Sequence, residues 1–522
     1  MKKSQKTTSI FELQNYLYNH FSEKAKNLMG EKITTISNYS KSFHNCLPQN
    51  YCVVKEKKIL ESLDKSDVCL FGDFHTLTKY QVNFIKIIET YAKKQDCKEV
   101  SIALEALNTS DQEYIDEYLE NKISEQEFIK KVDYYQKWGF PWEGYSNIFK
   151  YAKKNKTPIF AINYSNKSLF ERDQLIAKRI KNIALKYGKK VFCLIGEHHL
   201  ADSHLPSCIN SKSGGKEKKI HLTRIISNIE YYYAVEKSKN NYSSNENLEL
   251  KKDFYCILNT DPWIKWLSYI AWQEGKKSNL KLSNHNYDNS SLDLHELEPE
   301  FQFNYFVSIL CRFFKNKVKP HKIDYCKIIF HNENIFDADS ENEKKTLQLI
   351  AKQDYTLNNH HICKQNKFIY MRSYNLINLT QASSTFIFNI YNNEPDIDSS
   401  RNFSYYYVVK TVVTHLLSSI ILPTETKMQF RKKEYNISNQ KPDSATLHLL
   451  IEANLIEKRN INQNIKKLNN LHMIGKISAE ALFKKISENE DLIANHLINN
   501  ILKNKKDASY PVIFNRLIEL CC

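Results

Sequence analysis

The first half of the chain alternates short apolar runs with segments of helical period. Between the first two runs, apolar residues recur three or four positions apart from Tyr80 to Tyr91, which is the spacing of one helix face. Strands that are apolar throughout and separated by helices are buried on both faces. The pattern therefore predicts an α/β fold with a mainly parallel β-sheet flanked by helices. The apolar runs are at 68–72, 101–106, 158–163, 190–196 and 254–258.

The alternation stops after two polar stretches, 237–252 and 275–300, which we expect to be loops. The second is the best candidate for a domain boundary. The pattern thus predicts three parts: an N-terminal helical extension at 1–55, an α/β domain at 56–275 and a mainly α-helical accessory domain at 276–522.

Within the accessory part, segments 443–458 and 478–505 have a helical period. The most apolar stretch, 405–422, is interrupted by Lys410 and His415, so we expect a buried helix there and no membrane span. Segment 385–391, TFIFNIY, is rich in β-branched and aromatic residues and is expected to form a strand.

Composition excludes a disordered chain, and the kind of basic residue argues against a nucleic-acid partner. The 522 residues are 42% hydrophobic and 12% aromatic, which is enough for sizeable cores. The net charge is +16, but only nine of the basic residues are Arg, and Lys is spread along the whole chain. Because phosphate-reading surfaces favour the forked contacts of Arg, we expect no specific nucleic-acid partner.

The N-terminus, MKKSQK, is basic but has no apolar run of signal-peptide length behind it. The 12 Cys contain no Cys-x-x-Cys pair, and Cys69, Cys193 and Cys256 lie inside apolar runs. Reduced core thiols of this kind are typical of cytoplasmic proteins, so we expect a cytoplasmic location and no transmembrane segment.

Two segments share one chemical pattern. Gly72 to His75 ends the first apolar run, and Gly196 to His199 ends the fourth, so both have the form Gly-x-x-His after a strand. In open α/β sheets, ligands bind in the crevice outside the carboxyl ends of the strands. Glycine at such an end lets the chain turn and approach a ligand closely. The alternative is that each His caps a helix or lies in an exposed loop.

Glu105 interrupts the second apolar run, where an unpaired carboxylate would be costly. Together with His75 and His199 it is able to ligate a divalent metal ion or to act as a general base for water. The structural alternative is an ion pair with Arg172 or a neighbouring Lys. Asp73, Glu197 and His198 are expected to lie nearby. A further group, His360 to Cys363, has metal-capable side chains but is expected to be a loop.

These residues reveal a resemblance. The run from about Lys65 to Glu274 resembles the ChaN-type haem-binding domain of the Tiki superfamily, which also contains TraB-like proteins and erythromycin esterases. The resemblance rests on both Gly-x-x-His motifs, Glu105 in ALEAL, the helical insert DQEYIDEYLENKISEQEF with its close WGFPWEGY, the segment AKKNKTPIFAIN, and Arg172. One departure is Asp73, where the family commonly has Glu. The resemblance implies a parallel sheet with a small helical lid over the strand ends.

The resemblance implies a haem cofactor, which the family holds through tyrosine. Trp138 and Trp142 are able to stack on a flat ring, although aromatic residues in a lid more often pack in the core, and His198 is a further cofactor-binding candidate. Tyr145 is the tyrosine that we place first as cofactor-binding. The other lid tyrosines are Tyr134, Tyr135 and Tyr164.

Other superfamily members are hydrolases, and the resemblance therefore leaves a second function open. In a metal-dependent esterase or peptidase, His75, Glu105 and His199 would bind the metal or activate water, with Arg172 as a supporting charge. A third alternative is a non-enzymatic interaction protein with an idle pocket. In the first two cases the partner is a small molecule, and a homodimer is left open as the oligomeric state.

Overall fold

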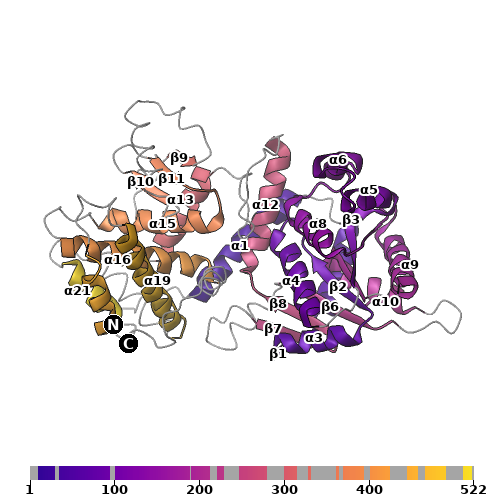
Figure 1. Ribbon diagram of the computed structural model, residues 1–522, viewed down its shortest axis with the longest axis horizontal. Coiled ribbons are helices and arrows are strands. Elements are labelled where there is room, and N and C mark those ends of the chain that lie inside the picture. Colours follow the sequence, from indigo (N-terminus) through magenta and orange to yellow (C-terminus); the bar gives the residue numbers. More distant parts are fainter. Residues whose placement is uncertain are drawn as a thin grey trace. The chain divides into compact units, whose positions relative to one another are not determined.

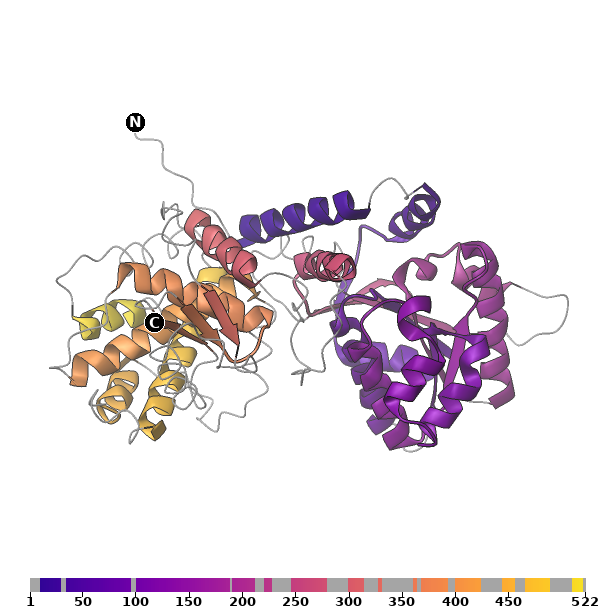
Figure 2. The ribbon, with the colours of Figure 1, turned by 90° about the horizontal axis from the view of Figure 1, so that it is seen from above.

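The chain folds into two compact units, which we describe separately. The sheet unit contains residues 20–232 and 244–278, and the helical unit contains residues 1–19, 233–243 and 279–522. Figures 1 and 2 show both. A computed structural model describes residues 10–29, 34–94, 100–187, 190–211, 220–227, 246–278, 299–313, 327–330, 360–363, 368–392, 400–423, 444–455, 465–488 and 509–519.

The sheet unit alternates strands and helices as the apolar pattern predicts. Helix α1 (Ile10–Met29) begins in the helical unit and ends in the sheet unit. The remaining elements are α2 (Thr34–Cys46), β1 (Cys52–Val54), α3 (Glu56–Lys65), β2 (Val68–Asp73), α4 (Thr78–Lys94), β3 (Val100–Asn108), η1 (Thr109–Asp111), α5 (Gln112–Leu119), α6 (Glu125–Lys131), α7 (Tyr134–Lys137), α8 (Glu143–Asn155), β4 (Ile159–Asn163), α9 (Leu169–Tyr187), β5 (Lys190–Gly196), η2 (Glu197–Leu200), α10 (Leu205–Asn210), β6 (Leu222–Ser227), β7 (Glu246–Lys251), β8 (Phe254–Leu258) and α12 (Pro262–Ser278).

One eight-stranded sheet organises this unit, with the strand order β1-β7-β8-β6-β2-β5-β3-β4. All neighbours from β8 to β4 are parallel, whereas β7 and β1 are antiparallel additions at one edge. All five predicted strands lie in the sheet, and the predicted α/β class is confirmed. The polar stretch expected as a loop at 237–252 instead contains β7, because pairing with β8 buries Leu248 and Leu250 on alternate positions.

Helices cover both faces of the sheet (Figures 1 and 2). Helix α4 packs with α8, and α9 packs with α10. The chain moves from β2 to β4 in one direction along the sheet and returns through β5 to β6. Because parallel crossovers are right-handed, the outward helices lie on one face and the return helices on the other. The apolar core beneath α4 and α8 includes Phe84, Ile88, Phe149 and the central residues of β2 and β3.

The helical unit is mostly α-helical, as predicted, but it also contains a small sheet. Its strands have the order β10-β11-β9, with β10 antiparallel and β9 parallel to β11. The described elements are α13 (Pro299–Phe313), β9 (Lys327–Phe330), β10 (His360–Cys363), β11 (Phe368–Met371), α15 (Leu376–Tyr391), α16 (Ser400–Ile421), α18 (Ser444–Glu452), α19 (Ile465–Glu488) and α21 (Tyr510–Glu519).

Helix α16 is the centre of the helical unit and contacts α15, α19 and α21. It contains nearly all of the predicted buried helix at 405–422, and most of its residues are buried, including the polar Thr414 and His415. Hydroxyl groups of α15 and α16 form hydrogen bonds with each other across the helix interface: Thr380 with Ser418 at 2.8 Å and Thr385 with Thr414 at 2.8 Å. The predicted buried helix is thus confirmed.

Two expectations for the helical unit are wrong. Segment 385–391 is the end of helix α15 and not a strand, because Asn375 caps that helix by accepting a hydrogen bond from the backbone N–H of Asn378, and burial overrides the β-propensity of the segment. Residues 360–363 form strand β10 and not a loop, because they pair with β11 and bury His360 against Thr385. The described part of segment 443–458 forms α18, except for residues 453–455, which are not helical. The described part of segment 478–505 belongs to α19. Their remaining residues lie outside the described ranges.

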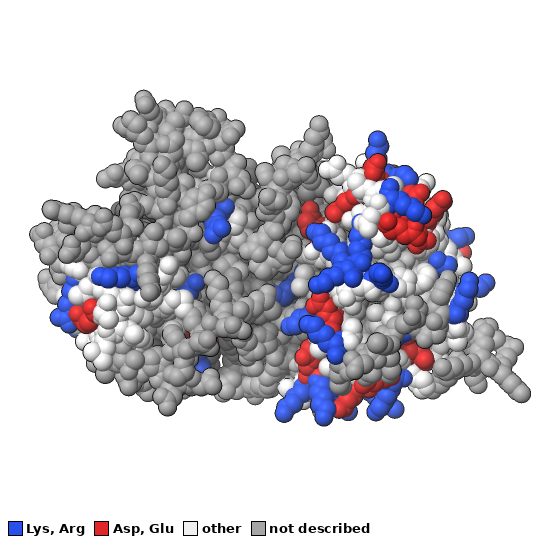
Figure 3. Space-filling model, viewed as in Figure 1, with Lys and Arg blue, Asp and Glu red and all other residues white. Residues whose placement is uncertain are grey.

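Among the described residues, no helix is long and apolar enough to cross a membrane. On the face seen in Figure 3, the Lys and Arg side chains of the sheet unit are interspersed with Asp and Glu.

Candidate functional site

The strand order brings the two Gly-x-x-His motifs together. Strands β2 and β5 are neighbours, and their register places Asp73 opposite Gly196 at the carboxyl ends. Strand β3 lies on the other side of β5, with Leu104 opposite Leu194, so Glu105 comes next to the same strand end. The predicted crevice residues of three strands thus meet at one edge of the sheet.

Gly196 lies at the centre of this meeting point. A Cβ atom built on Gly196 would lie 3.4 Å from Glu105 Oε2, 3.4 Å from His75 Nε2 and 3.5 Å from His199 Cδ2. The two imidazole atoms are therefore within about 7 Å of each other. We call Asp73, His75, Glu105, Arg172, Asp173 and His199 the strand-end cluster.

Glu105 is buried, with a side-chain exposure of 5%, and several donors surround its carboxylate. Oε1 accepts a hydrogen bond from the Arg172 guanidinium at 2.5 Å, and Oε2 accepts one from the backbone N–H of Gly196 at 2.7 Å. His199 Nε2 lies 3.3 Å from Oε1. Burial favours the neutral acid, but the charges of His199, His75 and Arg172 outweigh it and hold the pKa of Glu105 below its ordinary value.

His199 lies between two carboxylates. Its Nδ1 is 2.5 Å from Asp173 Oδ1, and its Nε2 faces Glu105. Burial lowers the pKa of His199, but Glu105 and Asp173 raise it to about 9. The imidazolium form, in which both ring nitrogens donate, is therefore favoured at neutral pH. Tyr39 of α2 donates to Asp173 Oδ2 at 2.7 Å and also lies 2.7 Å from His199 Nδ1.

His75 is the more exposed of the two cluster histidines, with a side-chain exposure of 22% against 6% for His199. Its Nδ1 lies 2.8 Å from Asp73 Oδ2, and Asp73 also accepts hydrogen bonds from Gln81 and Tyr145. Burial lowers the pKa of His75, whereas Asp73 and Glu105 raise it, and the net direction is upward. Asp73 thus fixes the orientation of the imidazole.

Aromatic rings from the segment between α7 and α8 lie against His75. Its ring centroid lies 4.6 Å from that of Trp138 and 4.8 Å from that of Phe140. Phe140 in turn stacks on Trp272 of α12, with centroids 4.6 Å apart and an interplanar angle of 22°. The surroundings of the solvent-reaching imidazole are therefore flat apolar rings.

Residues 59–171 match the family model described as "Haem-binding uptake, Tiki superfamily, ChaN". The predicted resemblance is confirmed. A solved structure titled "Cofacial heme binding to ChaN of Campylobacter jejuni" is 17% identical, and the match covers 39% of this chain and 92% of that chain with a TM-score of 0.29. No curated protein matches the chain.

Three of the predicted cofactor-binding residues are largely buried. Trp142 is 4% exposed and donates to Glu125 from within the core, and its part in cofactor binding stays a prediction. His198 faces Phe43 and His44 of α2, and burial together with Lys265 lowers its pKa to about 3. Tyr145 is buried, and its hydroxyl donates to Asp73 at 2.6 Å.

Among the described residues, no group of three or more His, Cys, Asp or Glu side chains is arranged to hold a metal ion. The oxygens of Glu105 already accept from Arg172 and Gly196 and face His199. Metal ligation by His75, Glu105 and His199 therefore stays a prediction, and the observed contacts form an ion-pair network.

Sequence reasoning missed Tyr39, Gln81 and Asp173. Asp173 directly follows Arg172 on α9, so its place near the cluster has a local signal. Tyr39 and Gln81 belong to no motif, and only the fold brings them to His199 and Asp73.

Replacing Arg172 tests the ion-pair network. Arg172→Met leaves the buried Glu105 carboxylate with fewer compensating charges, and we expect a loss of about 3 kcal/mol in the free energy of unfolding, measured with urea. The exposed Lys178→Met on the same helix is the control and should change little. A loss below about 1 kcal/mol in Arg172→Met would contradict the network.

The pH dependence of stability tests His199. Because its folded pKa of about 9 exceeds its ordinary value of 6.5, its contribution is complete below pH 6.5 and is lost as the pH rises through 9. Unfolding free energies at about pH 6 and pH 9.5 should differ less in His199→Gln than in the unsubstituted protein. His198→Gln, at the neighbouring position, should lose as much folding stability at alkaline pH as the unsubstituted protein does. An unchanged alkaline slope in His199→Gln would refute the assignment.

Proposed function

We propose that the sheet unit binds haem against the aromatic surface beside His75. The observation that carries the proposal is the combination of one solvent-reaching imidazole with Trp138, Phe140 and Trp272 around it. Flat rings suit the faces of a macrocycle. The description of the matching family supports the same ligand.

The side chains that could ligate the haem iron differ in how accessible they are. Tyr145 and Tyr134 are buried, and burial raises their pKa well above the ordinary value, so neither offers an accessible phenolate. Tyr135 is 41% exposed, but burial of the remainder together with Glu143 raises its pKa to about 12. His75 is partly exposed and already oriented by Asp73, and it is the donor that we place first. Bound haem would supply an iron centre with redox chemistry of its own.

A haemin titration followed by Soret absorbance tests the proposal. We expect saturable binding, weakened at least about tenfold in His75→Ala and in Trp138→Leu, because each removes part of the surface. Val53→Ala removes an exposed apolar side chain of β1, at the opposite edge strand of the sheet from β4, and should bind as the unsubstituted protein does.

Circular dichroism on each variant separates lost binding from lost folding. A titration that responds to Tyr135→Phe and not to His75→Ala would contradict His75 as the donor. Absorbance changes no larger than those of an unrelated basic protein would overturn haem binding altogether.

Hydrolysis is the second candidate, and one observation favours it. His75 combines solvent access with a carboxylate on its Nδ1, which is the arrangement of a general base that activates water. As a general base, the imidazole of His75 takes the proton of the attacking water, and Asp73 stabilises the imidazolium that results.

An assay with 4-nitrophenyl acetate tests this candidate. If His75 is the base, His75→Gln should reduce the rate about 100-fold, whereas His198→Gln should leave it unchanged. Equal rates in His75→Gln and the unsubstituted protein would exclude His75 as a base.

A further inference from the structure

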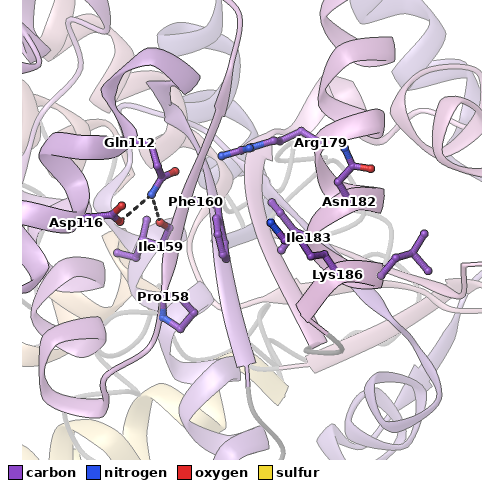
Figure 4. A pocket seen from close by; sticks show the side chains of 10 residues that line it. Gln112, Asp116, Pro158, Ile159, Phe160, Arg179, Asn182, Ile183 and Lys186 are labelled. Atoms are coloured by element: carbon purple, nitrogen blue, oxygen red, sulfur yellow. Dashed lines mark hydrogen bonds between the residues drawn. The ribbon is translucent and has the colours of Figure 1, made fainter.

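A cavity lies at the β4 edge of the sheet, between α5 and α9. Its volume is about 600 Å³, which is within the range of small-molecule sites. Figure 4 shows its lining, with Gln112 and Asp116 on one side and Arg179, Asn182 and Ile183 on the other.

Arg179 is the unusual member of this lining. Its Nε is buried, and among the described residues this nitrogen has no hydrogen-bond partner. Figure 4 shows the side chain extending from α9 toward β4. A guanidinium with a buried N–H that lacks an acceptor is poorly compensated, and because Nε itself is shielded, a ligand in the cavity would compensate the charge through the outer guanidinium nitrogens.

The strand edge itself is not free to bind a peptide strand at this point. Gln112 Nε2 donates to the Ile159 carbonyl at 2.9 Å, and Gln112 Oε1 accepts from the Ala161 N–H at 3.0 Å. The side-chain amide thus occupies the backbone groups that strand addition would need. Recognition in this cavity must come from side chains.

We propose that this cavity binds a small organic oxyanion, a carboxylate or a phosphate, through the Arg179 guanidinium. The planar fork of Arg matches such groups in a bidentate manner. Asn182 offers a further donor, and Phe160 and Ile183 provide an apolar wall for the body of the ligand. Asp116 lies across the cavity and accepts from Gln112 at 3.1 Å, so the anionic group belongs on the α9 side.

The cavity is separate from the strand-end cluster. Its lining reaches the beginning of β4 at Pro158, whereas the cluster lies at the carboxyl ends of β2, β5 and β3. On α9, Arg179 is two helical turns beyond Arg172, a rise of about 10 Å. The two proposals are therefore independent.

Calorimetric titration of the full chain with benzoate and with inorganic phosphate tests the site. We expect saturable binding of at least one anion, weakened about tenfold or more in Arg179→Gln and unchanged in the exposed control Lys178→Gln. Tighter binding of benzoate would identify a carboxylate with an apolar body, and tighter binding of phosphate would identify a phosphate ligand.

Thermal unfolding without ligand gives an independent readout. Because the buried Nε of Arg179 has no partner among the described residues, Arg179→Gln should not lower the unfolding temperature. Binding that survives in Arg179→Gln, or the absence of saturable binding of both anions, would overturn the proposal. His75→Ala should leave anion binding unchanged, which keeps this test distinct from the haem titration.

Discussion

The buried carboxylate of Glu105 is the constraint on which the strand-end cluster depends. An ionised group among buried apolar strands is stable only if opposite charge and hydrogen-bond donors surround it. Arg172 from α9, the N–H of Gly196 from β5 and His199 from η2 provide them. One side chain therefore ties three elements together at the carboxyl edge of the sheet.

This arrangement gives the two histidines different properties although their motifs are alike. His199 is enclosed between Glu105 and Asp173, which favours its charged form and a structural role. His75 is held by Asp73 at Nδ1 and reaches solvent beside Trp138 and Phe140. The same sequence pattern thus supplies one internal ion-pair partner and one group able to meet a ligand.

The helical unit solves a related problem without charge. Hydroxyl groups on α15 and α16 bond one another across the helix interface, and Ser383, Ser384 and Ser419 return hydrogen bonds to their own helices. A helix such as α16 can therefore be largely buried although it contains many polar residues. Its burial reflects satisfied hydrogen bonds as much as hydrophobicity.

The sequence by itself determined the α/β class, five of the six parallel strands and the polar residues at their ends, because hydrophobic period and strand-end chemistry are local properties. It did not determine that β5 lies between β2 and β3, which is what brings His75, Glu105 and His199 around Gly196. Tertiary structure also decided that Trp142 and Tyr145 are core residues, that segment 385–391 is helical, and that Tyr39 and Asp173 join the cluster. These outcomes depend on contacts between residues far apart in the chain, where burial and electrostatic compensation outweigh local propensity.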